Sequence, residues 1–122
     1  MKKVLFVEDE FTLQKAMSET LKKAGYDMIQ ALDGESGVRL ALSEKPDLIL
    51  LDVILPKMDG FQVLEKLKGE DETKDIPVIV LTNLGSSEDI EKSLSLGATT
   101  YLIKSDHGLE DILQKIETTI GK

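Results

Sequence analysis

The 122-residue chain has no cysteine and no tryptophan, and its aromatic residues are three phenylalanines and two tyrosines. The absence of cysteine excludes disulfides, zinc–thiolate sites and thiol nucleophiles. No apolar run approaches the roughly 20 residues of a membrane-spanning helix. The apolar stretch after the N-terminal lysines ends at Glu8, Asp9 and Glu10, which is not the pattern of a signal peptide. We therefore expect a cytoplasmic protein without a membrane partner.

Basic residues are also scarce, with 15 Lys and Arg against 23 Asp and Glu, for a net charge of −8. Sequence-independent binding to DNA or to anionic membranes needs a basic surface, so we expect no direct contact with nucleic acid. The length is typical of one domain and sufficient for a core without cross-links. No linker, repeat or low-complexity segment interrupts the chain. We expect residues 1–122 to form a single domain.

Short apolar segments alternate with segments of helical periodicity. The stretch 48–51 is continuously apolar, which is typical of a central parallel strand covered on both faces. The clearest helical stripe lies in 109–120. The helix expected between a hydroxyl cap at Ser86 and a stop at Gly97 is less apolar and should turn Ile90 and Leu94 inward. The Asp33-Gly34 and Asp59-Gly60 pairs indicate turns. Five strands are expected near 3–7, 27–31, 48–51, 76–82 and 99–104, alternating with five helices in a parallel sheet.

Polar residues close the predicted strands where ligands bind in such sheets. Because parallel strands point the same way, their carboxyl ends gather at one edge. The residues at these ends are Glu8, Asp9, Asp52, Thr82 and Lys104. Three carboxylates in a small space repel one another, and a bound cation relieves the repulsion. All-oxygen ligands suit Mg²⁺.

The same group of residues forms a receptor for a phosphoryl group. Lys104 adds a positive charge, and Thr82 adds a hydroxyl that can donate to an oxyanion. Asp52 can itself accept the phosphoryl group, because carboxylates are established covalent nucleophiles. Catalysis would then rest on positioning and charge neutralisation.

Several motifs in order make the chain resemble a bacterial response-regulator receiver domain of two-component signalling, over essentially its whole length. No single motif decides the resemblance; their order and spacing do. They are Val7-Glu8-Asp9, the segment from Leu51-Asp52 through Leu55-Pro56-Lys57-Met58-Asp59-Gly60, Val80-Leu81-Thr82, Gly97-Ala98 and Tyr101-Leu102-Ile103-Lys104.

The resemblance implies a flavodoxin-like, doubly wound α/β fold with strand order 2-1-3-4-5. It implies that Asp52 takes a phosphoryl group from a phosphohistidine on a sensor histidine kinase or a histidine phosphotransfer protein. Thr82 and Lys104 would contact the phosphoryl oxygens. The Mg²⁺ ligands would be Glu8, Asp9, Asp52 and the backbone carbonyl of Val53.

The resemblance also implies a conformational switch. Thr82 would move toward the phosphate and Tyr101 would turn inward, changing the surface formed by helix four, strand five and helix five for a downstream protein target. We expect a stand-alone regulator without an output domain, monomeric or weakly dimeric. It would be a signalling domain rather than an enzyme, although it would assist its own phosphorylation and slow dephosphorylation.

The sequence departs from the family at four positions, of which Glu8 in place of the commoner Asp should keep the metal site. Ser105 stands where proline usually follows the lysine in a cis bond, and a cis Lys104–Ser105 bond would cost about 3 kcal/mol. Ile54 and Leu84, each two residues beyond Asp52 or Thr82, are apolar and cannot orient an attacking water. We therefore expect slow self-dephosphorylation. The single histidine, His107, lies in a polar loop, and we assign it no ligand role.

The sequence argues against two other functions and leaves a third open. A flavin or nucleotide site would need a Gly-rich loop after the first strand, where this chain has acids. An aspartyl phosphatase would be expected to carry a second acid two residues after its nucleophile, where this chain has Ile54. A receiver-like interaction module that takes no phosphate stays open because of Ser105.

Overall fold

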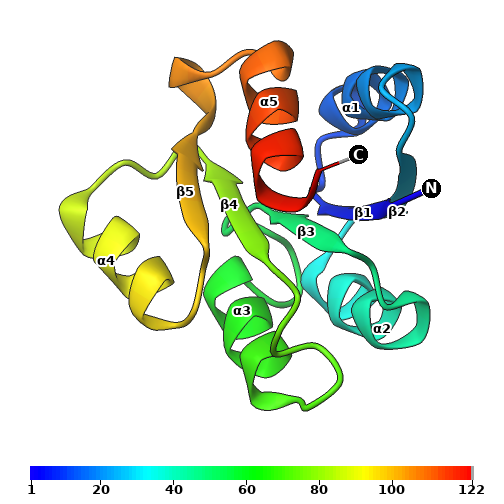
Figure 1. Cartoon of the computed structure of the whole chain (residues 1–122). Helices are drawn as coiled ribbons and strands as arrows, with labels where there is room; N and C mark the ends of the chain where they lie inside the picture. Colours follow the sequence, from blue (N-terminus) through cyan, green and yellow to red (C-terminus); the bar gives the residue numbers. More distant parts are fainter. Residues whose placement is uncertain (122) are drawn as a thin grey trace.

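The computed structural model describes residues 1–121 and contains one five-stranded parallel sheet in the order β2-β1-β3-β4-β5 (Figure 1). This order confirms the predicted flavodoxin-like fold. Three strands lie as predicted, and the other two are shorter than predicted. The strands are β1 (Lys3–Val7), β2 (Asp27–Ala31), β3 (Leu48–Leu51), β4 (Val78–Thr82) and β5 (Thr100–Ile103).

Five helices cover the two faces of the sheet, with α1 and α5 on one face and α2, α3 and α4 on the other (Figure 1). Within the described residues, no helix is long and apolar enough to cross a membrane. The helices are α1 (Phe11–Lys23), α2 (Gly34–Glu44), α3 (Gly60–Gly69), α4 (Ser87–Ser95) and α5 (Leu109–Ile120), and a 3₁₀ turn covers Lys104–Asp106.

Strand β3 explains why its sequence is apolar without alternation. Leu48 and Leu50 point into the core under α1 and α5, whereas Ile49 and Leu51 point into the core under α2 and α3. All four side chains are fully buried. Each such side chain stabilises the fold by about 1.5–3 kcal/mol relative to an exposed one. The strand that precedes Asp52 is therefore held from both sides.

Two predicted turns are helix N-caps. The Asp33 carboxylate accepts a hydrogen bond from Ser36 N at 2.8 Å and starts α2. Asp59 accepts from Gln62 N at 3.0 Å while the Gln62 side chain accepts from Asp59 N, which forms a capping box at the start of α3. The Ser86 cap of α4 was expected from its sequence, and it is present.

Helix α4 is the least embedded of the helices. Ser93 is its only buried residue, and Leu94 is 47% exposed. The prediction that Leu94 points inward is therefore wrong, because α4 turns the Ser93 side toward the molecule. The Lys92 ammonium lies 4.3 Å from the centre of the Phe61 ring and links α4 to α3.

Gly60 packs closely against the backbone of the loop after β3. A Cβ atom on Gly60 would lie 2.3 Å from Val53 Cα and 2.5 Å from the Asp52 carbonyl, both of them backbone atoms. We expect Gly60→Ala to lower the free energy of unfolding by about 3 kcal/mol in urea denaturation, because the backbone cannot move aside cheaply. The matched control is Gly69→Ala at the other end of α3, where a Cβ meets nothing within 4 Å. Equal stability of the two variants would contradict this account.

Candidate functional site

The predicted site residues follow β1, β3, β4 and β5 along one edge of the sheet. Val7 at the end of β1 pairs with Leu51 at the end of β3. The residues that follow them, Glu8 and Asp52, therefore leave the sheet side by side. Thr82 ends β4 beside Ile103, and Lys104 follows at once. The edge thus brings together two carboxylates, a hydroxyl and an ammonium that lie far apart in the sequence.

Lys104 joins the two carboxylates. Its Nζ donates to Asp52 Oδ2 at 2.9 Å and forms an ion pair with Glu8 Oε1. Glu8 is 1% exposed and Asp52 is 4% exposed. Burial acts to lower the pKa of Lys104, but its hydrogen bonds to Asp52 and Glu8 outweigh burial and raise it. The ammonium therefore stays charged at any physiological pH.

Burial also governs the charge of Glu8. It raises the pKa of Glu8 to about 7, the hydrogen bond from Lys104 acts in the opposite direction, and the nearby Asp52 charge raises it further. The second carboxylate oxygen of Glu8 accepts a hydrogen bond from Glu10 N at 3.2 Å. One lysine therefore does not fully compensate two buried carboxylates.

Carboxylate oxygens of Glu8, Asp9 and Asp52 lie within 4.8 Å of one another. Asp9 is exposed, so this cluster opens to solvent on one side. Hard oxygen donors of this kind fit Mg²⁺, which retains several waters and needs only a few protein ligands. The residues present thus fit a divalent cation, whose charge would balance the excess of negative charge.

The loop after β3 orients Asp52. Ile54 N donates to Asp52 Oδ1 at 3.1 Å, so both Asp52 oxygens are held. The Val53 carbonyl, predicted to be a metal ligand, accepts from Gly60 N at 2.9 Å and keeps one free lone pair. No hydrogen bond from a residue within 1–121 reaches the Ile54 carbonyl. Its oxygen is therefore free to accept a further contact, whereas the sequence analysis considered the Val53 carbonyl alone.

The residues assigned to the switch meet at the backbone of Leu84. Leu84 N donates to Thr82 Oγ1 over a long 3.5 Å contact, and the Tyr101 hydroxyl donates to the Leu84 carbonyl. Burial raises the pKa of Tyr101, with further contributions from the charges of Asp89 and Asp52, so the phenol stays protonated and available as a donor. The backbone of Leu84 thus contacts the side chains of both Thr82 and Tyr101.

Gln14 was not predicted as part of the site. Its buried side-chain amide donates to the carbonyls of Phe6 at 2.9 Å, Ala31 at 3.0 Å and Glu8 at 3.1 Å. These bonds tie the start of α1 to the ends of β1 and β2, at the backbone of Glu8. The only signal in the sequence is a polar residue next to the apolar stripe of this helix, which is too common to be diagnostic.

Although Ser105 replaces the proline usual in the family, Lys104 still contacts Glu8 and Asp52. No peptide bond within residues 1–121 is cis, so the Lys104–Ser105 bond is trans and begins the 3₁₀ turn. His107 closes this turn, its N–H donating to the Lys104 carbonyl. Proline is therefore not required for the ammonium to contact Asp52.

The sequence of this chain matches a known protein family. The family model of the response regulator receiver domain matches residues 4–117. The chain belongs to this family. Receiver domains bind Mg²⁺ through an acidic pocket and accept phosphate from histidine kinases or phosphotransfer proteins, and Glu8, Asp9 and Asp52 form an acidic cluster of this kind.

Three relatives illustrate the similarity. The receiver chain is 39% identical over 122 residues to the DNA-binding dual master transcriptional regulator RpaA of Synechocystis, matching all of this chain and 50% of RpaA. It is 37% identical over 102 residues to sporulation initiation phosphotransferase F of Bacillus subtilis, matching 84% of this chain and 81% of that protein. The crystal structure of the Mn²⁺-bound form of response regulator Rcp1 superposes with a TM-score of 0.82 at 34% identity, covering 97% of this chain and 93% of that one.

The chain spans half the length of RpaA and less than half the length of several other curated relatives that it matches. What it shares with them is the receiver domain, and this homology supports a phosphoryl-accepting function.

The raised pKa of Glu8 predicts a specific pH dependence of stability. Between about pH 4.5, its ordinary value, and about pH 7, the folded protein binds more protons than the unfolded chain. Stability should therefore fall as the pH rises through this window and level off above it, by at most about 3 kcal/mol. Lys104, with a pKa raised above 10.5, and Asp33, with a pKa lowered below 3.8, do not titrate there. Urea denaturation in EDTA between pH 5 and 8 measures the effect.

The test compares Glu8→Gln with Glu10→Gln, a change of the exposed acid two residues on. Glu8→Gln should flatten the profile and match the wild type most closely at pH 5, where Glu8 is mostly protonated. Glu10→Gln should retain the wild-type profile. The same slope in all three proteins would show that Glu8 is not the group responsible.

Proposed function

We propose that this receiver domain, residues 1–122, stores a signal as a phosphoryl group on Asp52. The donor is a phosphohistidine on a sensor histidine kinase or a histidine phosphotransfer protein. The observation that carries the proposal is the position of Lys104, whose ammonium contacts Asp52 and Glu8 next to the exposed Asp9. One edge of the sheet thus combines the proposed nucleophile Asp52, the positive charge of Lys104 and a cluster of acids that can bind a cation.

The transfer requires Asp52 in its ionised form. One Asp52 carboxylate oxygen attacks phosphorus, a P–O bond forms, the P–N bond breaks, and its electron pair returns to the imidazole of the donor. Hydrogen bonds from Ile54 N and Lys104 orient the carboxylate before attack. Lys104 then neutralises charge on the phosphoryl oxygens, and the Thr82 hydroxyl donates to one of them.

The proposed cation is Mg²⁺, held by Glu8, Asp9, Asp52 and one carbonyl of the loop after β3. That carbonyl is Val53 through its free lone pair, or Ile54, whose oxygen accepts no bond within the described chain. When bound, the cation would supply positive charge that stabilises the negative charge of the transferring group. Deprotonated Glu8 is the form that binds, so binding should strengthen as the pH rises through about 7.

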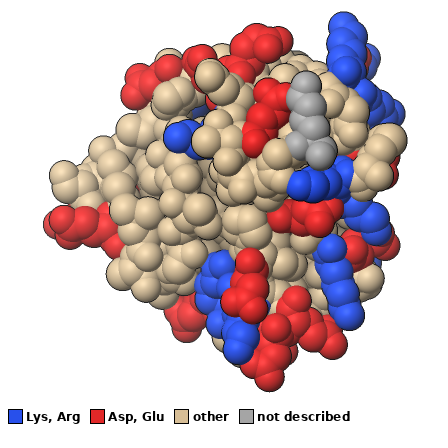
Figure 2. Space-filling view, viewed as in Figure 1, with Lys and Arg blue, Asp and Glu red and all other residues tan. Residues whose placement is uncertain are grey.

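The proposed output is a change at the surface of α4, β5 and α5. Movement of Thr82 toward a phosphoryl group would pull on Leu84, whose carbonyl holds the Tyr101 hydroxyl. Figure 2 shows that the face over β4, β5 and the inner side of α4 carries few charges, as a protein-docking surface often does. We propose a downstream protein target there, in the cytoplasm, with the chain acting as a monomer or weak dimer and as a signalling domain rather than an enzyme.

Intact mass spectrometry tests the phosphoryl acceptor. After incubation with acetyl phosphate and Mg²⁺, the wild type should gain one phosphoryl group and Asp52→Asn should gain none. Asp71→Asn, which changes an almost fully exposed acid, is the control and should behave as the wild type. Uptake by Asp52→Asn would refute the assignment. No uptake by the wild type with Mg²⁺ bound would favour the receiver-like interaction module.

The Ile54 side chain, 55% exposed beside Asp52, should set the lifetime of the phosphorylated state. An apolar side chain cannot orient a water molecule for attack on phosphorus, whereas an amide can. We expect Ile54→Asn to shorten the half-life of the phosphorylated protein several-fold, measured by the decay of the phosphorylated mass. Ile54→Val keeps the site apolar and should leave the half-life unchanged. A longer half-life in Ile54→Asn than in Ile54→Val would contradict this role.

A further inference from the structure

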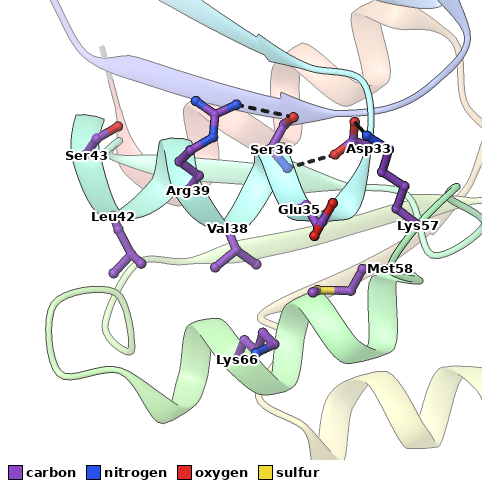
Figure 3. Close-up of a pocket in the computed structure, with 10 residues that line it drawn as sticks. All are labelled: Asp33, Glu35, Ser36, Val38, Arg39, Leu42, Ser43, Lys57, Met58 and Lys66. Atoms are coloured by element: carbon purple, nitrogen blue, oxygen red, sulfur yellow. Dashed lines mark hydrogen bonds and ion pairs between the residues drawn. The ribbon is translucent and has the colours of Figure 1, made fainter.

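A groove of about 780 Å³ lies between α2 and α3, outside the acidic cluster (Figure 3). Val38 and Leu42 project from α2 toward α3, and Met58 projects into the same space from the loop before α3. All three side chains are half-buried. They form an apolar floor that no described part of the chain covers.

Cations surround this floor from three elements. Arg39 lies on the α2 side, Lys66 on the α3 side and Lys57 at the loop end (Figure 3). Neither Arg39 nor Lys66 has an acid within 4 Å in the described part of the chain. Arg39 donates to Ser36 Oγ at 3.4 Å, and its charge acts on Asp33 only over a longer distance. With Asp33 and Glu35 also lining the groove, three cations face two acids, so the rim has one excess positive charge on a chain of net charge −8.

The two acids of the groove differ in availability. Asp33 accepts from Ser36 N and pairs with Lys57 at 3.8 Å, and the backbone hydrogen bond from Ser36 is the main cause of its lowered pKa. Glu35 is exposed and has no ion pair within the described residues. Glu35 is thus the one acid lining the groove whose charge has no ion pair among the described residues, and it would repel a ligand that carries carboxylates.

The loop end of the groove is preorganised. Lys57 adopts a left-handed conformation, with φ 67°, inside a three-residue turn closed by Met58 N and the Pro56 carbonyl at 2.8 Å. Its salt bridge to Asp33 ties this turn to the start of α2. The loop end of the groove is therefore shaped before a ligand binds, which lowers the cost of binding there.

We propose that the α2–α3 groove docks an acidic segment of a partner protein, helical or extended, that carries apolar side chains. Its apolar residues would cover Val38, Leu42 and Met58, and its carboxylates would face Arg39 and Lys66. Amphipathic segments bind such grooves between helices through alternating apolar anchors and peripheral charges. This docking does not use Asp52, so it does not depend on the proposed phosphoryl transfer.

The test uses a short fluorescein-labelled peptide of leucine and glutamate and its counterpart with lysine for glutamate. We expect the glutamate peptide to bind, with amide shift changes centred on the groove in ¹⁵N-labelled full chain, and the lysine peptide to bind roughly tenfold more weakly. Asp52→Asn should bind the glutamate peptide as the wild type does, which separates this proposal from the proposed function.

Neighbouring side chains should give effects of opposite sign. Arg39→Gln with Lys66→Gln should weaken binding of the glutamate peptide several-fold, whereas Glu35→Gln should strengthen it. Lys15→Gln with Lys22→Gln, an equal charge change on exposed α1 positions, is the control and should have no effect. Equal binding of the two peptides, shift changes elsewhere, or self-association through these residues in sedimentation would overturn the proposal.

Discussion

The arrangement of the molecule depends on one buried ammonium shared by two carboxylates. Lys104 contacts Asp52 and Glu8 where both are nearly inaccessible to water. Burying a carboxylate without compensation is costly, and two carboxylates facing one lysine leave a net negative charge. The fold tolerates this excess because Asp9 opens the cluster to solvent and offers room for a cation. The site is thus electrostatically incomplete, which is what a receptor for a cation and a phosphoryl group requires.

The sheet keeps these charges together. Because β1 and β3 pair in parallel and in register, Glu8 and Asp52 cannot separate without breaking Val7–Leu51 pairing in the fully buried centre of the sheet. Gln14 adds three hydrogen bonds, one of them to the Glu8 carbonyl, and the close approach of Gly60 to Val53 fixes the loop beyond Asp52. The packing energy of the two cores thus opposes the repulsion at their edge.

Much of this arrangement was predictable because it follows from short-range patterns. The continuous apolar run before Asp52 indicated a central parallel strand, and parallel strands bring their carboxyl ends to one edge. Prediction from the sequence was limited where one residue type occurs in two kinds of local structure. Asp before Gly indicates a turn, yet Asp33 and Asp59 cap helices through side-chain hydrogen bonds three residues on. Leu94 lies outside because α4 is at the edge of the molecule, and helical spacing alone does not say which face meets the core.

The proposed switch residues lie where the fold is least anchored. The Leu84 peptide groups contact both Thr82 and Tyr101, so in the proposed function a shift of Thr82 cannot leave Tyr101 unchanged. Helix α4 begins three residues later and buries only Ser93, whose hydroxyl has no hydrogen bond within the described chain. Moving α4 therefore costs little packing, whereas moving β3 would disrupt both cores. A small displacement at the proposed phosphorylation site is for this reason expected to be transmitted to the α4 side of the molecule, with β3 held in place.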